Sequence, residues 1–237
     1  MKEMIAKRKS CRKYTDAPLS DAILESIRSF QMEPLYPDIQ VRWHVVEKEH
    51  IRSPFAFTTE QLVVIFSENK PGYLENVGFM FQQMDLWLQK QGLGVCWLGM
   101  GKPKDETKAL EPDLDFVIML TVGYPDEEIQ RKDLSEFIRE PLEKISDQAD
   151  ARLEPVRLAP SSCNTQPWYF VHDGDVMHVY WDQKAILRKA ILGYFNQIDM
   201  GIGLAHLYVT NPETFRFFRV DGVATIRGFQ YIGSITF

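Results

Sequence analysis

Hydrophobic residues recur along the chain with two different periodicities, one typical of helices and one typical of strands. Between residues 73 and 91 the apolar stripe is too broad for a surface helix, which predicts a long, buried central helix. A second helix is expected over about 194–209, and a shorter one begins after Ser20, which can cap it. Apolar, β-branched and aromatic runs predict strands at 40–47, 62–66, 116–122, 168–171, 176–181 and 231–237.

The order of elements in the second part of the chain repeats the order in the first. Four short matches occur in the same sequence in both parts, separated by between 115 and 125 residues. They pair Glu33–Leu35 with Glu154–Val156, Arg42–Val46 with Pro167–Val171, Asn76–Gly78 with Asp199–Gly201, and Val117–Thr121 with Ile232–Thr236. Each match is weak alone, and chance repetition is the alternative, but together they favour an ancient duplication. A charged connector, 126–150, would join the two parts and carry a short helix at 134–138.

Composition narrows the class of protein. The chain has 237 residues, of which 45% are hydrophobic and 25% charged, so it can bury an ordinary core. Its 27 basic and 33 acidic residues give a net charge of −6, which disfavours nucleic acid and anionic membrane as partners. We find no apolar run of about 18 residues that could span a membrane and no secretory signal. A cytoplasmic location is expected.

Several familiar kinds of reactive site are disfavoured by residue spacing. The three cysteines, Cys11, Cys96 and Cys163, are far apart, so a disulfide framework or a structural zinc site is not expected. The five histidines lack metal-ligand spacing. Ser161 and Ser162 lack the Gly-x-Ser-x-Gly elbow of many hydrolases. We expect neither a metal site nor a side-chain nucleophile.

Three segments could instead hold a ligand. The basic opening at 8–14 suits a phosphate through charge-assisted hydrogen bonds, although a solvated basic arm has the same composition. The segment 160–168 (PSSCNTQPW) offers hydroxyls and amides that can donate and accept, although an ordinary polar loop does so too. The glycines between 92 and 101 match neither the dinucleotide fingerprint nor a phosphate loop, and close backbone packing explains them.

Taken together, these segments resemble the nitroreductase family of FMN-dependent oxidoreductases, and in particular its internally duplicated thermophile-type (TM) branch. Residues 8–14 with 18–20 are similar to the family's N-terminal motif, which holds FMN. Residues 159–168 are similar to its second flavin-contacting motif, and 76–78 with 92–99 to its central helix and following loop. In ordinary members the second motif follows the N-terminal helix. Here 33–43 holds a degraded version, and the good copy lies after residue 150.

This resemblance implies an α+β, nitroreductase-like three-layer fold with flanking helices, in which one chain mimics the family dimer. Residues 1–145 would form the first half and 146–237 the second, intertwined around one FMN. The cofactor-binding residues implied by the family motifs are Arg8, Lys9, Ser10, Arg12, Trp97, Leu98, Gly99 and Arg131 from the first half, and Pro160, Ser161, Ser162, Asn164 and Gln166 from the second.

The resemblance also implies an activity. Hydride would pass from NAD(P)H through the flavin to a nitroaromatic, a quinone or a similar small acceptor, and no catalytic side chain is required because the flavin carries the chemistry. A monomer is favoured, since the family interface would be internal, with a homodimer as the alternative. Three other readings stay open: a flavin sensor or carrier without turnover, a different flavin reaction such as reductive dehalogenation or dehydrogenation of a peptide azole, and an interaction protein with a basic surface motif.

Overall fold

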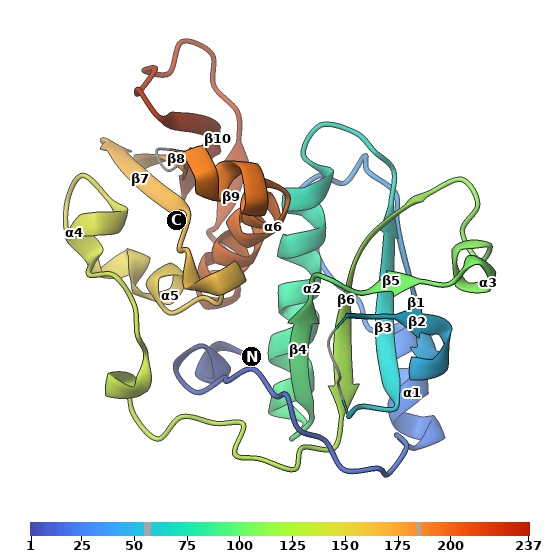
Figure 1. Cartoon of the computed structure of the whole chain (residues 1–237). Helices are drawn as coiled ribbons and strands as arrows, with labels where there is room; N and C mark the ends of the chain where they lie inside the picture. The colour runs from blue at the N-terminus through green and yellow to red at the C-terminus, as the bar shows by residue number, and fades with distance from the viewer. Residues whose placement is uncertain (55–57, 184–185) are drawn as a thin grey trace.

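Two antiparallel sheets lie on either side of a pair of long helices (Figure 1). The computed structural model describes residues 1–54, 58–183 and 186–237. The first sheet has the order β1-β3-β6-β4 and the second the order β7-β8-β10-β9. Helices α2 and α6 pack against each other along the boundary between the two sheets. This mixed arrangement of helices and sheets agrees with the predicted α+β class.

The strands of the first half are β1 (Val41–Glu47), β2 (Ile51–Arg52), β3 (Gln61–Ser67), β4 (Gly94–Leu98), β5 (Lys102–Pro103) and β6 (Asp115–Gly123), of which β2 and β5 form a separate pair. Those of the second half are β7 (Trp168–Asp173), β8 (Val176–Asp182), β9 (Arg216–Phe218) and β10 (Phe229–Thr236). The helices are α1 (Asp21–Ser29), α2 (Tyr73–Lys90), α3 (Asp105–Lys108), α4 (Leu142–Ile145), α5 (Glu154–Arg157) and α6 (Ile186–Thr210). Short 3-10 turns are η1 (Lys2–Ala6), η2 (Lys48–His50), η3 (Leu134–Glu136), η4 (Ala151–Leu153) and η5 (Ser162–Asn164).

Strand β3 shows how the first sheet is buried. Every one of its residues is buried, and its apolar side chains alternate between two apolar clusters. Val63 and Ile65 join the main core beneath α2, while Leu62, Val64 and Phe66 join a smaller cluster on the other face. The main core continues across α2 and α6 into the second sheet, so one apolar core supports both halves.

The two central helices approach each other unusually closely. A Cβ atom at Gly78 of α2 would lie 2.0 Å from the carbonyl oxygen of Ile198, and one at Gly201 of α6 would lie 1.9 Å from that of Glu75. No other residue fits these two positions without moving a backbone. Gly78 and Gly201, the last residues of the matching segments Asn76–Gly78 and Asp199–Gly201, therefore allow the backbones of α2 and α6 to come into contact.

The predicted long helix at 73–91 is confirmed by α2, and the predicted strands correspond to β1, β3, β6, β7, β8 and β10. The helix expected at 134–138 is wrong: only the 3-10 turn η3 forms there. Asp133 caps that turn, and Phe137 leaves it to lie against Arg131. Helix α6 begins eight residues earlier than the expected start, at Ile186 instead of 194. The sequence did not predict β2, β5 and β9, because strands of two or three residues are too short to show an alternation of apolar and polar side chains.

The N-terminal arm, residues 7–15, runs beside the connector that links the two halves (Figure 1). Isolated bridges join Arg8 to Gln130 and Tyr14 to Pro125. The backbone N–H of Cys11 also donates to the carbonyl of Val95 in β4, 2.9 Å away. The arm is thereby fixed between the first sheet and the connector. Within the described residues, no helix combines the length and apolarity needed to cross a membrane.

Candidate functional site

A cleft of about 190 Å³ lies where the N-terminal arm, β4 and α6 meet the loop before β7. Seven of the residues predicted to bind a cofactor line it together: Ser10, Arg12, Trp97, Gly99, Pro160, Ser161 and Ser162. Its other lining residues are Cys96, Ile118, Cys163, Phe195, Ile198, Asp199 and Ile202. The basic arm of the first half and the Pro-Ser-Ser segment of the second half thus share one cleft, although about 150 residues separate them in the sequence.

The wall formed by β4 is flat and aromatic. The indole N–H of Trp97 donates to Oε1 of Gln82 on α2, 3.1 Å away, which fixes the ring in place. At Gly99, directly after β4, a Cβ atom would lie 2.7 Å from the ring of Phe195, so the chain at the end of the strand is in close contact with the aromatic ring of α6. Trp97 and Phe195 together give the cleft apolar surfaces suited to a planar ring system.

A buried acid on α6 holds the opposite wall. The backbone N–H of Ser162 lies 3.0 Å from Oδ1 and 3.1 Å from Oδ2 of Asp199. Asn196 donates to the same carboxylate over 2.9 Å. Burial raises the pKa of Asp199 to about 7, against an ordinary 3.8, and the hydrogen bonds from Asn196 and Ser162 oppose that shift. The hydroxyl of Ser161 accepts from the N–H of Gln166 at 2.9 Å, which closes the loop on itself.

The same loop stores backbone strain. Cys163, Asn164 and Gln166 have φ values of 50°, 56° and 47°, in the left-handed region that side chains disfavour. For Cys163 and Gln166 this conformation costs about 1–2 kcal/mol each, whereas asparagine tolerates it better. Three such residues within four positions indicate that the surroundings impose the shape of the loop, as is typical of binding sites.

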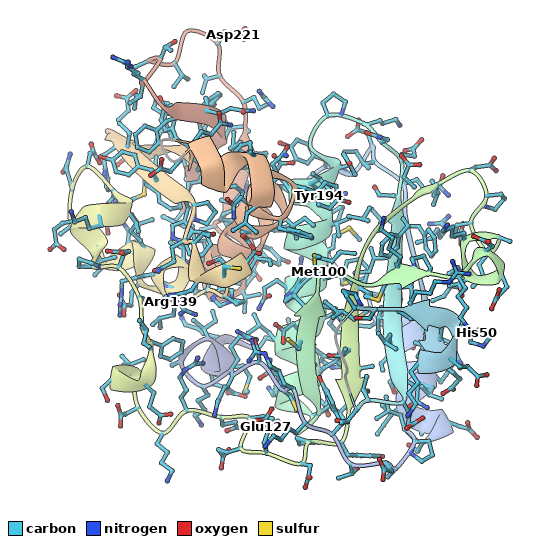
Figure 2. The ribbon with its side chains drawn as sticks, in the orientation of Figure 1. His50, Met100, Glu127, Arg139, Tyr194 and Asp221 are labelled. Atoms are coloured by element: carbon cyan, nitrogen blue, oxygen red, sulfur yellow. The ribbon has the colours of Figure 1, made fainter. Side chains whose placement is uncertain are left out.

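Three arginines gather beside this loop. Nε of Arg139 donates to the carbonyl of Ala159 at 3.1 Å, and its Nη1 donates to Oδ1 of Asn164 at 2.6 Å. The guanidinium carbons of Arg131 and Arg139 lie 4.0 Å and 5.5 Å from the centre of the Phe137 ring. Figure 2 shows Arg139 between α5 and the N-terminal arm. Nη1 of Arg131 donates to the backbone carbonyl of Arg8.

These guanidiniums repel one another. Burial, followed by the positive charges of Arg131, Arg8 and Arg157, lowers the pKa of Arg139 to about 10. The pKa of Arg131 is also lowered, first by burial and then by Arg8. Because these buried positive charges repel one another, binding of an anion between them is favourable. A phosphate has enough oxygens to accept hydrogen bonds from all of them.

The remaining predicted residues lie behind the cleft lining. Arg8 is 1% exposed and pairs with Asp85 of α2, while the backbone N–H of Lys9 donates to Gln89. Leu98 packs on the other face of the first sheet. Asn164 and Gln166 brace the loop: the amide of Asn164 donates to the carbonyl of Ile138, and Oε1 of Gln166 accepts from the N–H of Glu140.

The chemistry of the donors fits a flavin mononucleotide. The cleft offers apolar faces for a ring system, hydroxyls at Ser10, Ser161 and Ser162, and the guanidinium of Arg12. The arginine cluster beside it supplies positive charge that would pair with a phosphate. Sequence reasoning missed Gln82, Asp85, Arg139, Phe195 and Asp199. A signal existed for Asp199, which opens the second copy of the third repeat match, whereas Arg139 was hidden in a charged connector.

Comparison with known proteins identifies the family. A family model described as "Putative TM nitroreductase" matches residues 1–211. The structure of a putative nitroreductase from Thermotoga maritima MSB8 is similar to this chain, with a TM-score of 0.66 and 19% identity, covering 99% of this chain and 92% of that one. A nitroreductase family protein from Clostridium difficile 630 gives a TM-score of 0.47 and 18% identity, covering 61% and 95%.

A putative nitroreductase from Desulfovibrio desulfuricans, determined in complex with FMN, gives a TM-score of 0.37 and 21% identity, covering 56% of this chain and 92% of that one. A search of curated proteins found no significant match. The family model covers most of the sequence, and the Thermotoga structure shares the fold over nearly all of it. This chain therefore belongs to the TM nitroreductase family and has the nitroreductase fold.

Proposed function

We propose that this chain is an FMN-dependent oxidoreductase that takes hydride from NAD(P)H and delivers it to a nitroaromatic, a quinone or a similar small acceptor. The observation that carries the proposal is the shared cleft. Ser10 and Arg12 of the basic arm face Pro160, Ser161 and Ser162 of the second motif across it. Neither segment makes a flavin site alone, and together they supply both walls.

The residues present have separate tasks in this proposal. Trp97 and Pro160 bound the space for the ring system, and the hydroxyls of Ser161 and Ser162 are available to its polar edge. Arg12 places a positive charge at the cleft, which favours an anionic reduced form of any bound ring. Arg131 and Arg139 lie where a phosphate would be held. When bound, FMN supplies the capacity to accept and release hydride, so these side chains only bind, orient and exclude water.

The internal duplication belongs to the same proposal, with halves at 1–145 and 146–237. In each sheet the first two strands pair antiparallel, a long helix follows, and the fourth strand pairs between the second and the third. Asn76 accepts the N–H groups of Leu35 and Tyr36 as Asp199 accepts that of Ser162. Matched residues thus hold corresponding loops in the two halves, which supports a common origin.

The duplication would create a second, equivalent position, and aromatic side chains enter it. Trp97 pairs with Leu120, and Phe217 pairs with Ile235, the repeat partner of Leu120. Phe217 therefore takes the place of Trp97. Its ring lies 2.4 Å from where a Cβ of Gly233 would be, and it stacks edge-on against Tyr36 with centroids 5.5 Å apart. The rings of Phe217 and Tyr36 thus take up part of this position, beside a hollow that Leu35 and Phe79 line with Phe217. Their packing supports one FMN per chain and a monomer as the working unit.

Anaerobic titration tests the proposed reaction. The FMN-loaded protein is mixed with NADH or NADPH, and the oxidised flavin absorbance is followed. We expect it to bleach with at least one of the two donors and to return when a nitroarene or a quinone is added. A protein that binds FMN but is reduced by neither donor would be a flavin carrier or sensor, and the oxidoreductase proposal would fail.

A further inference from the structure

A buried acid on α2 anchors the basic arm. Asp85 is fully buried, and its Oδ2 lies 3.2 Å from Nε of Arg8, which is itself 1% exposed. The amide of Gln89, one turn later on α2, donates to the other oxygen of Asp85, and its own oxygen accepts the backbone N–H of Lys9 at 3.2 Å. The central helix thus holds two successive residues of the arm.

This anchoring directs the rest of the Arg8 guanidinium toward the cleft. Its Nε faces Asp85, while its Nη2 donates to the hydroxyl of Ser10 at 3.3 Å, and Ser10 lines the cleft. On the other side, Arg131 donates to the Arg8 carbonyl, and Arg139 shares the Phe137 ring with Arg131. Arg8 therefore connects the cleft to the arginine cluster.

Burial, together with the positive charge of Arg8, lowers the pKa of a neighbouring histidine, His206. His206 is fully buried, and its Nδ1 donates to the carbonyl of Pro155 at 2.9 Å, so its Nε2 accepts from the amide of Gln82 at 3.2 Å. Burial first, and the charge of Arg8 second, lower the pKa of His206 to about 3, which keeps it neutral. Glu136 also lies near the cluster, but it is exposed and accepts from the backbone N–H of Lys132 at 2.7 Å.

We propose that Asp85 is a positioning residue and the resident counter-ion of a phosphate subsite formed by Arg8, Arg131 and Arg139. It would orient Arg8 and compensate its charge when no ligand is bound, since a buried guanidinium without a partner destabilises the fold. Burial raises the pKa of Asp85, and the charge of Arg8 and the hydrogen bond from Gln89 oppose that rise and favour the ionised carboxylate. The same carboxylate repels a phosphate on the far side of Arg8, so it also moderates affinity. The inference rests on the proposed function in taking the phosphate to be that of FMN.

Two substitutions separate orientation from charge. Asp85→Asn keeps the shape and an acceptor oxygen but removes the charge, and Asp85→Leu removes both. The affinities of the apo-protein for FMN and for riboflavin, which lacks the phosphate, are measured by quenching of flavin fluorescence. We expect Asp85→Asn to bind FMN about tenfold more tightly and Asp85→Leu about tenfold more weakly. Riboflavin affinity should stay the same in both, which a general structural defect would not produce.

A matched control lies on the same helix. Glu75 is also a buried acid of α2, but the charge that acts on it is that of Arg219, from the loop after β9. Glu75→Gln should change neither FMN nor riboflavin affinity at the cleft. The inference is overturned if Asp85→Leu weakens FMN and riboflavin equally, or if Asp85→Asn binds FMN as the unmodified chain does.

The inference can also be separated from the proposed function. If the unmodified protein binds neither flavin, the FMN proposal fails, and inorganic phosphate becomes the probe of the subsite. Phosphate should then raise the thermal midpoint of the unmodified protein, raise that of Asp85→Asn more, and raise that of Asp85→Leu less. Absence of any shift in the unmodified protein would overturn the subsite itself.

Discussion

The carboxylate of Asp199 accepts the backbone N–H of Ser162 with both of its oxygens, at 3.0 Å and 3.1 Å. One buried side chain of α6 thus sets the position of the loop that carries the Pro-Ser-Ser motif. In the first half, Oδ1 of Asn76 holds Leu35 and Tyr36 in the same way, at 2.8 Å and 2.9 Å. The neutral amide of Asn76 thus accepts backbone N–H groups in the first half, as the acid Asp199 does at the cleft.

Asp199→Asn should change how stability depends on pH. Burial raises the folded-state pKa of Asp199 to about 7, above its ordinary 3.8, so its contribution to stability is full below pH 4 and is lost as the pH rises toward 7. The free energy of unfolding of the variant, relative to the unmodified chain, should therefore increase by about 1.4 kcal/mol per pH unit in this window. Urea denaturation at several pH values measures it. A constant difference between the two proteins across this range would contradict the assignment.

Gly78→Ala and Gly201→Ala should each destabilise the protein strongly. A methyl group at either position meets a backbone carbonyl of the facing helix at about 2 Å, so the helices must separate. Overpacking of this kind typically costs 1–3 kcal/mol or more. Gly203→Ala is the control, because its Cβ would meet the side chains of Val156 and Trp168 instead of backbone. Chemical denaturation should give Gly78→Ala and Gly201→Ala clearly lower free energies of unfolding than Gly203→Ala.

Substitutions of Cys163 test whether the loop that follows Pro160, Ser161 and Ser162 is strained. Its φ of 50° suits glycine, so Cys163→Gly should preserve stability or raise it by about 1 kcal/mol. Cys163→Val should lower stability, because a β-branched residue tolerates the left-handed region poorly. The residue is exposed, so lost packing contributes little to either variant. Thermal midpoints that fall equally in both variants would show that the backbone conformation is not the cause.

Arg139→Met should weaken binding of FMN but not of riboflavin. Charge-assisted hydrogen bonds contribute about 1.5–3 kcal/mol, so the dissociation constant for FMN should rise roughly 10- to 100-fold. Lys144→Met removes an exposed positive charge of α4 and serves as the control. Isothermal titration of the apo-proteins gives both constants. Equal losses for FMN and riboflavin would assign Arg139 to the fold of the loop instead of to the phosphate.

The fold was largely predictable because its long elements have strong periodic patterns. Helix α2 and the central strands bury continuous apolar stripes, and the repeat matches at Asn76–Gly78 and Asp199–Gly201 mark where the helices meet. Strand β9 was not predicted, because three residues carry no period. The turn η3 was mistaken for a helix because its ending depends on the tertiary contact between Phe137 and Arg131.

The candidate site was predictable where motifs are local and not where contacts are distant. Ser10, Arg12 and 160–162 stand in recognisable segments, and the structure brings them to one cleft. Asp85 and Arg139 act through partners 77 and 25 residues away, at Arg8 and Asn164, so no local pattern reveals them. Buried charges of this kind become visible only when the arm and the connector are placed in space.

The most direct test of the central claim is the flavin content of the purified protein. Its visible absorption spectrum is recorded, and released flavin is identified and quantified per chain. The shared cleft, and the packing of Phe217 and Tyr36 at the second position, predict one FMN per chain. A colourless protein that takes up no added FMN would contradict the cofactor assignment, and two FMN per chain would contradict the single shared site.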